Sequence, residues 1–170
     1  MFIVVDGYNF IGAVKRLNPG LENLRESLVS EIEEYAALSG RSVIVVFDGG
    51  EEGETYTSKN ARKGVKVVFS PPGVEADDVI IEICRKYSGC LAVTNDSYIR
   101  KAIESYNSFA VSCEEFAETM RKASQETGGE SDSRHATRDP DEDDSPPSKK
   151  GNPRRLSKKE RKRRKLLDKL

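Results

Sequence analysis

Short runs of apolar, mostly β-branched residues alternate along the chain with longer stretches in which apolar residues recur every three or four positions. The runs show no apolar–polar alternation, which is typical of strands buried on both faces of a parallel sheet. The predicted strands are residues 2–5, 42–47, 65–69, 91–94 and 109–111. The other stretches predict helices at residues 10–16, 21–38, 74–87, 97–105 and 112–123.

This order of elements predicts an α/β fold of three layers, with helices on both faces of a mostly parallel five-stranded sheet. The longest helix is expected to end at Gly40. Ser112 and Glu115 have the three-residue spacing of a capping box, so Ser112 is predicted to cap the last helix. We therefore expect a single folded domain at residues 1–123.

The composition changes after residue 123. Residues 124–153 consist mainly of Gly, Ser, Asp, Glu and Pro, and they bury too little apolar surface to offset the entropy of ordering, so we predict a disordered acidic linker. Residues 154–170 are predicted to be a basic tail that becomes helical only on a partner. Residues 149–170 carry 12 basic and 2 acidic side chains, against 14 and 19 in residues 1–123, which indicates an interaction tail. The alternative is a tail that only keeps the protein in solution.

Several classes of protein fit the sequence poorly. The three cysteines, Cys84, Cys90 and Cys113, show no CxxC spacing, which argues against a disulfide framework or a zinc site. The chain shows no signal peptide and no apolar run of about 18 residues, so we expect a cytoplasmic protein without a membrane segment. His135 is the only histidine and falls in the predicted linker, which disfavours histidine-based catalysis. The chain has no Walker A pattern, and no GxGxxG pattern follows the first predicted strand, so a nucleotide cofactor is weakly supported.

Acidic residues follow three of the predicted strands and open the helix after another. In an open α/β sheet, ligands bind at the edge where the strands end, so these side chains should gather there. The six carboxylates expected at this edge are those of Asp6, Asp48, Glu75, Asp77, Asp78 and Asp96. Any one of them also has a simpler interpretation as a turn residue, a helix cap or a favourable charge in a first helical turn.

Three carboxylates within Glu75–Asp78 repel one another unless a cation offsets their charge. Oxygen ligands without a neighbouring Arg or His favour a hard divalent ion such as Mg²⁺ or Mn²⁺. Such ions support phosphoryl transfer without a side-chain nucleophile. The sequence therefore predicts a metal-dependent site for phosphate chemistry.

Polar and aromatic residues near these carboxylates are further candidates. Asn9 and Asn95 are predicted to orient water or phosphate, or to serve as turn residues. Tyr8 is predicted to stack on a base, or to pack at the start of a helix. The basic residues of the segment after the second strand, predicted either to bind a phosphate backbone or to be solvated charges, are Lys59, Arg62, Lys63 and Lys66.

Four motifs in this order resemble the YacP-like family, within the NYN branch of the PIN-like nucleases. The motifs are Val5-Asp6-Gly7-Tyr8-Asn9, Val46-Phe47-Asp48-Gly49-Gly50, Glu75-Ala76-Asp77-Asp78 and Thr94-Asn95-Asp96, and the similarity covers about residues 1–120. The resemblance implies a PIN-like (Rossmann-like) nuclease domain with Asp6, Asp77 and Asp96 as core metal ligands. It implies that Asp78, Glu75 and Asp48 are secondary ligands or contact the core ligands from outside, and that Asn9 is the family's Asn near the active site. The implied activity is ribosome-associated cleavage of messenger RNA.

The leading hypothesis is a Mg²⁺- or Mn²⁺-dependent endoribonuclease that cleaves single-stranded RNA and leaves a 3′-hydroxyl and a 5′-phosphate. Residues 51–64 and the basic tail would contact the ribosome. A second hypothesis is an RNA- or ribosome-binding module with a vestigial site. A third is a phosphatase that acts on small phosphates in a closed pocket.

Overall fold

The computed structural model of the chain describes residues 2–14, 20–49, 64–128 and 161. Its five strands are β1 (Phe2–Asp6), β2 (Ser42–Phe47), β3 (Val65–Phe69), β4 (Leu91–Val93) and β5 (Phe109–Val111). They form one sheet in the order β3-β2-β1-β4-β5, and every neighbouring pair is parallel. The predicted α/β class and five-stranded sheet are confirmed, and the sheet is parallel throughout.

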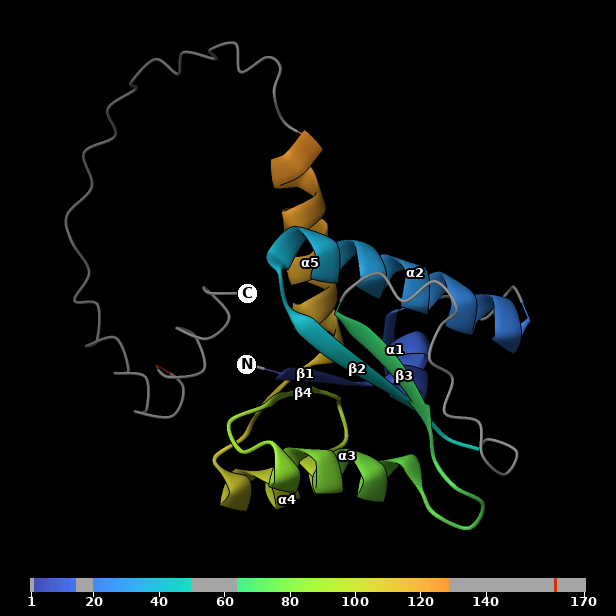
Figure 1. The fold of residues 1–170 in the computed structure, drawn as a ribbon, viewed down its shortest axis with the longest axis vertical. Helices are drawn as coiled ribbons and strands as arrows, with labels where there is room; N and C mark the ends of the chain where they lie inside the picture. Colours follow the sequence, from blue (N-terminus) through green and yellow to red (C-terminus); the bar gives the residue numbers. More distant parts are fainter. Residues whose placement is uncertain (1, 15–19, 50–63, 129–160, 162–170) are drawn as a thin grey trace, which may run out of the picture. The chain divides into compact units, whose positions relative to one another are not determined.

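Helices cover both faces of this sheet. They are α1 (Gly7–Val14), α2 (Leu21–Ser39), α3 (Ala76–Lys86), α4 (Ser97–Ala102), the short 3₁₀ helix η1 (Ile103–Tyr106) and α5 (Cys113–Gly128). In Figure 1, α1, α2 and α5 lie on one side of the strands, while α3 and α4 lie on the other. The three-layer arrangement therefore has the predicted form.

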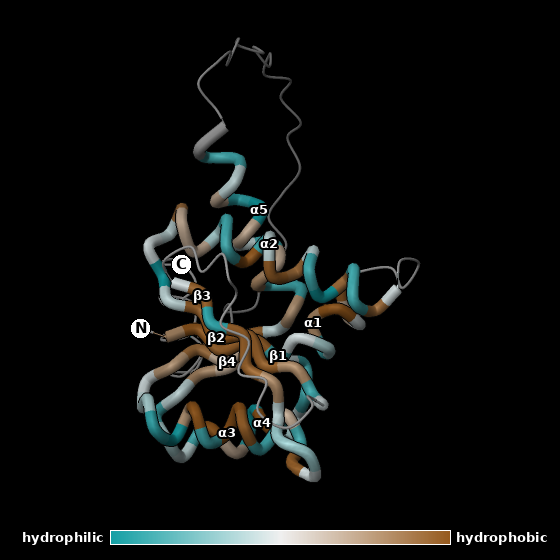
Figure 2. Tube along the Cα trace, turned by 45° about the vertical axis from the view of Figure 1, so that its right-hand side comes forward, coloured by the Kyte–Doolittle hydropathy of each residue, from teal (hydrophilic) through white to brown (hydrophobic). Residues whose placement is uncertain are grey.

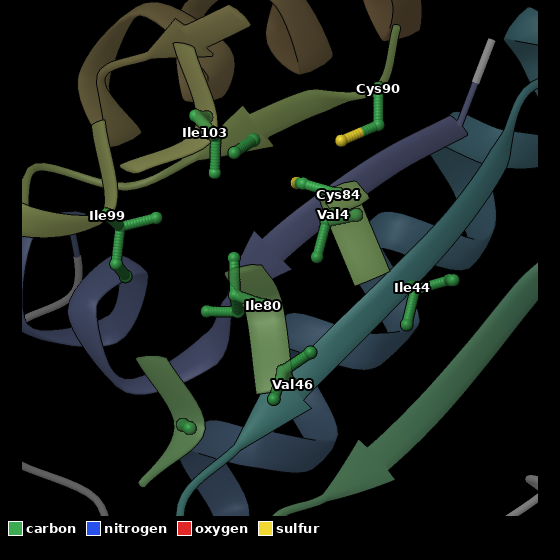
Figure 3. Close-up of a cluster of buried hydrophobic side chains, with 10 residues drawn as sticks. Val4, Ile44, Val46, Ile80, Cys84, Cys90, Ile99 and Ile103 are labelled. Carbon is green, nitrogen blue, oxygen red and sulfur yellow. The ribbon is translucent and has the colours of Figure 1, made fainter. Parts of the chain in front are cut away.

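The core explains why the strands show no polar alternation. The inner parts of β1 and β2 are buried on both faces, and in Figure 2 they form an apolar centre between helices with hydrophilic outer surfaces. Under α3 and α4, Val4 and Val46 meet Ile80 in the cluster drawn in Figure 3. On the other face, the ring of Phe116 contacts that of Tyr35 edge-on at 5.2 Å between centroids.

Helix α3 is shorter than the predicted 74–87 and α2 is one residue longer than the predicted 21–38, and three helices differ more from the prediction. Helix α1 begins at Gly7, directly after β1, whereas the sequence predicted a helix from residue 10. The predicted helix 97–105 is divided between α4 and η1. Helix α5 continues to Gly128, past the predicted end at residue 123. The prediction ended the helix too early because its last turns are polar and have no apolar stripe.

The capping box at the start of α5 is confirmed. The backbone N–H of Ser112 donates to Glu115 Oε2 at 2.9 Å, and the N–H of Glu115 donates to Ser112 Oγ at 3.2 Å. The predictions for the acidic linker beyond residue 128, for the segment 51–63 and, apart from residue 161, for the basic tail fall outside the described residues. None of the described helices is long and apolar enough to cross a membrane.

The order of the strands indicates at which edge of the sheet a ligand would bind. The chain runs from the central β1 to β2 and β3 on one side, and then crosses through α3 to β4 on the other side of β1. The order therefore reverses between β1 and β4, and ligands of such sheets bind where these strands end. The residues there are Asp6, at the end of β1, and Thr94, Asn95 and Asp96, directly after β4.

Candidate functional site

Asp6 is the most enclosed carboxylate of the site, with a relative exposure of 7%. Its Oδ1 accepts a hydrogen bond from the backbone N–H of Asn9 at 3.1 Å, and its Oδ2 accepts one from the Thr94 hydroxyl at 3.1 Å. Burial raises the pKa of Asp6, and the negative charges of Asp77 and Asp96 raise it further, while the two hydrogen bonds oppose the rise. A partly desolvated negative charge thus lies at the switch point of the sheet.

Thr94 connects this carboxylate to the next one. Its side chain is fully buried, and its Oγ1 accepts a hydrogen bond from the N–H of Asp96 at 3.0 Å while donating to Asp6. Asp96 itself caps α4, since its Oδ1 accepts from the N–H groups of Tyr98 at 2.6 Å and Ile99 at 3.3 Å. The simpler interpretation of Asp96 as a helix cap is therefore observed, and the charge of the same residue also acts on Asp6.

The start of α3 supplies three more carboxylates. Glu75 is exposed, and its side chain makes no capping hydrogen bond, while Asp77 and Asp78 lie in the first helical turn. Partial burial raises the pKa of Asp77, and the nearby charges that raise it further are those of Asp96, Glu75, Asp78 and Asp48. Asp77 is therefore within electrostatic range of carboxylates from three separate segments of the chain.

Asp48 lies just after β2 and is exposed. The hydroxyl of Ser70, which is 1% exposed, donates to Asp48 Oδ1 at 2.9 Å and accepts from the N–H of Gly49 at 3.1 Å. Ser70 follows β3, so it fixes the end of one strand against the end of its neighbour. The structure thus brings all six predicted carboxylates to one edge of the sheet, which we call the carboxylate edge.

Two asparagines hold the carboxylate edge together. Asn9 Oδ1 accepts hydrogen bonds from the N–H of Asn95 at 2.9 Å and from the thiol of Cys113 at 3.3 Å. Asn95 Oδ1 accepts from the N–H of Cys113 at 3.1 Å, and Asn95 Nδ2 donates to the carboxylate of Glu114 at 3.1 and 3.2 Å. Both side chains therefore join the segment after β4 to the starts of α1 and α5. Their contact with RNA or water stays a prediction.

The Cys113 thiol is held in its protonated form. Its burial raises its pKa to about 12, and the charges of Asp6 and Glu114 add to this rise. A protonated thiol can donate to the amide oxygen of Asn9, which is the role the geometry gives it. Cys113 is thus a structural partner of the site.

The predicted RNA contacts, Tyr8 and the basic residues, lie less close to the carboxylates where the structure describes them. The half-buried Tyr8 ring packs against Phe47, with centroids 5.2 Å apart and an angle of 61° between the rings. Lys66 is exposed near the start of β3, paired with Ile44 of β2, whereas the carboxylates gather where the strands end. Lys59, Arg62 and Lys63 fall outside the described residues.

The carboxylate edge fits a hard cation by its donor chemistry, because all six side chains offer carboxylate oxygens. The charged neighbours that act on Asp6 and Asp77 are also all carboxylates, so each of them adds to the repulsion. Among the described residues, no three His, Cys, Asp or Glu side chains form a group that could hold a metal ion as they stand. Metal ligands must lie close together, and without an ion the repulsion between these carboxylates disfavours such close spacing.

Sequence reasoning missed several residues that position the carboxylates. Thr94 belongs to one of the four motifs but had no predicted role, and Ser70, Cys113 and Glu114 were not considered as part of the site. Thr94 and Ser70 share one signal, a hydroxyl residue directly after a strand at the same edge as the carboxylates. Cys113 and Glu114 lie in the first turn of α5, and no comparable signal in the sequence marks them.

Comparisons with known proteins agree with this architecture. The model of the YacP-like NYN domain matches residues 3–168. Uncharacterized protein YacP of Bacillus subtilis (strain 168) is 32% identical over 87 residues, which make up 49% of this chain and 51% of that protein. The matched part of the chain thus covers about half the length of this relative.

Two solved structures share the fold. The crystal structure of Rae1 (YacP) from Bacillus subtilis matches with a TM-score of 0.62 and 26% identity, and covers 75% of this chain and 78% of that one. A mutant of the same protein gives a TM-score of 0.63 and 26% identity, over 75% and 79% of the two chains. The fold is thus of the nuclease type. Since the family model covers nearly the whole length, the chain belongs to the YacP-like NYN domain family.

Proposed function

We propose that this protein is an endoribonuclease that depends on Mg²⁺ or Mn²⁺ and cleaves single-stranded RNA. The observation that carries the proposal is the convergence of six carboxylates from four segments of the chain at the carboxylate edge. Asp6 and Asp77 both have pKa values raised by burial and by neighbouring carboxylates, so a divalent cation bound between them would relieve the repulsion. Membership in a family with a nuclease-type fold supports the same conclusion.

Asp6, Asp77 and Asp96 would hold the ion, with Asp78, Glu75 and Asp48 around it. When bound, such an ion activates water for attack on phosphorus and stabilises charge on the attacking and leaving oxygens. The products would be a 3′-hydroxyl and a 5′-phosphate.

The chain itself contributes the placement of the carboxylates. Asn9 and Thr94 orient both oxygens of Asp6, which keeps its lone pairs directed in a fixed way. Because Asn9 Oδ1 already accepts two hydrogen bonds, its Nδ2 group is the part of the side chain that can donate to a phosphate oxygen or to water. No histidine is present in the described part of the chain, so no imidazole acts as the base there.

The proposed substrate is messenger RNA on the ribosome. This assignment rests on the resemblance to the YacP-like family and on the 12 basic residues within residues 149–170, which suit a phosphate backbone. Residues 51–64 and the basic tail are the proposed ribosome contacts.

The test compares the wild type with Asp77→Asn on an end-labelled single-stranded RNA, with Mg²⁺, Mn²⁺ or EDTA, and with or without ribosomes. We expect metal-dependent cleavage by the wild type and a loss of roughly 100-fold or more in the variant, because several kcal/mol of charge stabilisation disappear. Glu82→Gln is the matched control, since Glu82 lies on the same helix, is exposed and pairs with Arg85 at 2.8 Å. This control should cleave like the wild type.

Cleavage that is equal in EDTA and in Mn²⁺, or that survives Asp77→Asn unchanged, would refute the proposal. RNA binding without cleavage in any metal would favour the binding module instead. Hydrolysis of small phosphate esters without RNA cleavage would favour the phosphatase.

A further inference from the structure

We infer that Tyr98 stacks on an unpaired base of the RNA, beside the carboxylate edge. The inference rests on the proposed function and extends it to a residue that positions the substrate. Tyr98 lies two residues after Asp96, in the first turn of α4.

The first observation is the exposure of this ring. At 59%, Tyr98 is the most exposed large hydrophobic side chain in the described part of the chain. Among the described residues its ring has no aromatic or cationic partner, unlike the rings of Phe2, Tyr8 and Tyr87. A single exposed aromatic residue is ordinary on a protein surface, so its position has to carry the argument.

The second observation is where the backbone of Tyr98 is held. Its N–H donates to Asp96 Oδ1 at 2.6 Å, so the residue is fixed directly beside a proposed metal ligand. The next residue, Ile99, is fully buried and points into the cluster drawn in Figure 3. Tyr98 therefore combines a rigid backbone with an exposed ring, which is the arrangement that a precise contact requires.

The third observation separates Tyr98 from the other aromatic residues. The ring of Tyr8, also at this edge, packs edge-on against Phe47 and is half-buried. Phe2 and Tyr87 pair with each other, with centroids 4.8 Å apart, where β1 begins and α3 ends. Tyr98 is thus the exposed ring that lies beside the carboxylates without a ring or cation partner in the described chain.

The chemistry that suits such a ring is base stacking. Every base has a π-face, so an aromatic side chain binds bases with little regard to their identity. Stacking requires the base to be unstacked and unpaired, as in single-stranded RNA. A base held on Tyr98 would keep the phosphate of that nucleotide near Asp96, which favours cleavage in unpaired segments over cleavage in duplexes.

The test measures binding in the full-length Asp77→Asn background, so that the RNA is not consumed. The probe is a short fluorescein-labelled single-stranded RNA, together with a series in which each nucleotide in turn is abasic, and the readout is fluorescence anisotropy. Adding Tyr98→Ala to this parent should weaken binding of the intact RNA by about 5- to 100-fold, whereas adding Tyr98→Phe should leave the affinity unchanged. For the RNA that is abasic at the stacked position, the parent and the Tyr98→Ala protein should bind equally well.

Tyr87→Ala is the matched control, because it removes an exposed ring far from the carboxylates and should not change RNA binding. Equal affinities of the parent and Tyr98→Ala for intact RNA, or a loss that is the same for every abasic RNA, would overturn the inference. If the wild type binds RNA through Tyr98 but never cleaves it, only the proposed function fails. If the wild type cleaves RNA and Tyr98→Ala binds normally, only the stacking inference fails.

Discussion

At the edge of the sheet where the strands end, carboxylates from four segments lie within range of one another's charge. At the opposite edge, where the strands begin, ring and backbone contacts join the elements. There the rings of Phe2 and Tyr87 pair at 4.8 Å, and the N–H of Val43 donates to the carbonyl of Gly64 at 2.7 Å. The two edges belong to the same five strands and differ in the residues that flank each strand at its two ends.

This difference indicates that the two edges have different roles, stability at the starting edge and chemistry at the carboxylate edge. The contacts at the starting edge add to stability, and besides the ring pair they include Lys86 Nζ, which lies 5.6 Å from the centroid of the Tyr87 ring. The carboxylate edge does the reverse, because repulsion lowers the stability of the free protein and creates a site for a cation. Substitutions at the carboxylate edge should therefore change RNA cleavage, whereas substitutions at the starting edge should change only the free energy of unfolding.

Among the changes in stability, the largest is expected from Thr94→Val, which removes a hydrogen-bonding group that supports the carboxylate edge. The change leaves a buried oxygen of Asp6 and the N–H of Asp96 without the hydroxyl they share. We expect the free energy of unfolding to fall by about 1–3 kcal/mol and RNA cleavage to fall by roughly 10- to 100-fold. Urea denaturation and single-turnover cleavage measure the two effects.

Thr94→Ser restores the hydroxyl and is the control for this variant. It should recover most of the cleavage rate, although it still lacks the buried methyl group. Wild-type cleavage by Thr94→Val would mean that the bridge between Asp6 and Asp96 has no part in the activity.

The next effect is a gain in stability from Asp77→Asn in metal-free protein. Folding raises the pKa of Asp77, so the carboxyl contributes stability at low pH that is lost as the pH rises through the raised pKa. At pH 7 the variant should therefore melt above the wild type, by a small amount because Asp77 is only partly buried and solvent screens its charge. The gap should close as the pH falls toward 3.8, the ordinary pKa of the group. Differential scanning calorimetry across this pH range measures it.

Addition of Mg²⁺ or Mn²⁺ sharpens the same comparison. The wild type should gain more thermal stability from the ion than Asp77→Asn does, because ligand binding to the folded state stabilises it. An Asp77→Asn protein that melts below the wild type without metal would show that repulsion is not the dominant effect at this edge.

The smallest effect is expected from Tyr87→Ala at the starting edge. Loss of the ring pair with Phe2 should lower the free energy of unfolding by about 0.5–1.5 kcal/mol, while RNA cleavage stays at the wild-type rate. Urea denaturation and the cleavage assay check the two halves of this prediction. A slower cleavage rate in a fully folded Tyr87→Ala protein would contradict the separation of the two edges.

The sequence predicted the strands and the edge to which the acidic residues belong, because both follow from local patterns and from one rule about parallel sheets. The side-chain bonds that position them were not predictable in the same way. Thr94 and Asp6 are 88 residues apart, and Asn95 and Asn9 are 86 apart, so only the folded sheet brings them together. No spacing in the chain indicates which hydroxyl meets which carboxylate.

The start of α1 was missed for a related reason. Asp6-Gly7-Tyr8-Asn9 has the composition of a turn, and glycine is common in turns. In the fold, Gly7 is needed because a Cβ there would lie 2.3 Å from the ring of Phe47. The glycine allows close packing, and the chain enters the helix without a loop.

The direct junction of β1 and α1 limits how the length of this protein can vary. Asp6 is the last residue of the strand, and Gly7 is the first of the helix. One inserted residue would turn α1 by about 100° relative to the strand, since a helix has about 3.6 residues per turn. Asn9 would then no longer reach Asp6 and Asn95 together. Insertions and deletions during evolution or engineering should therefore spare this junction.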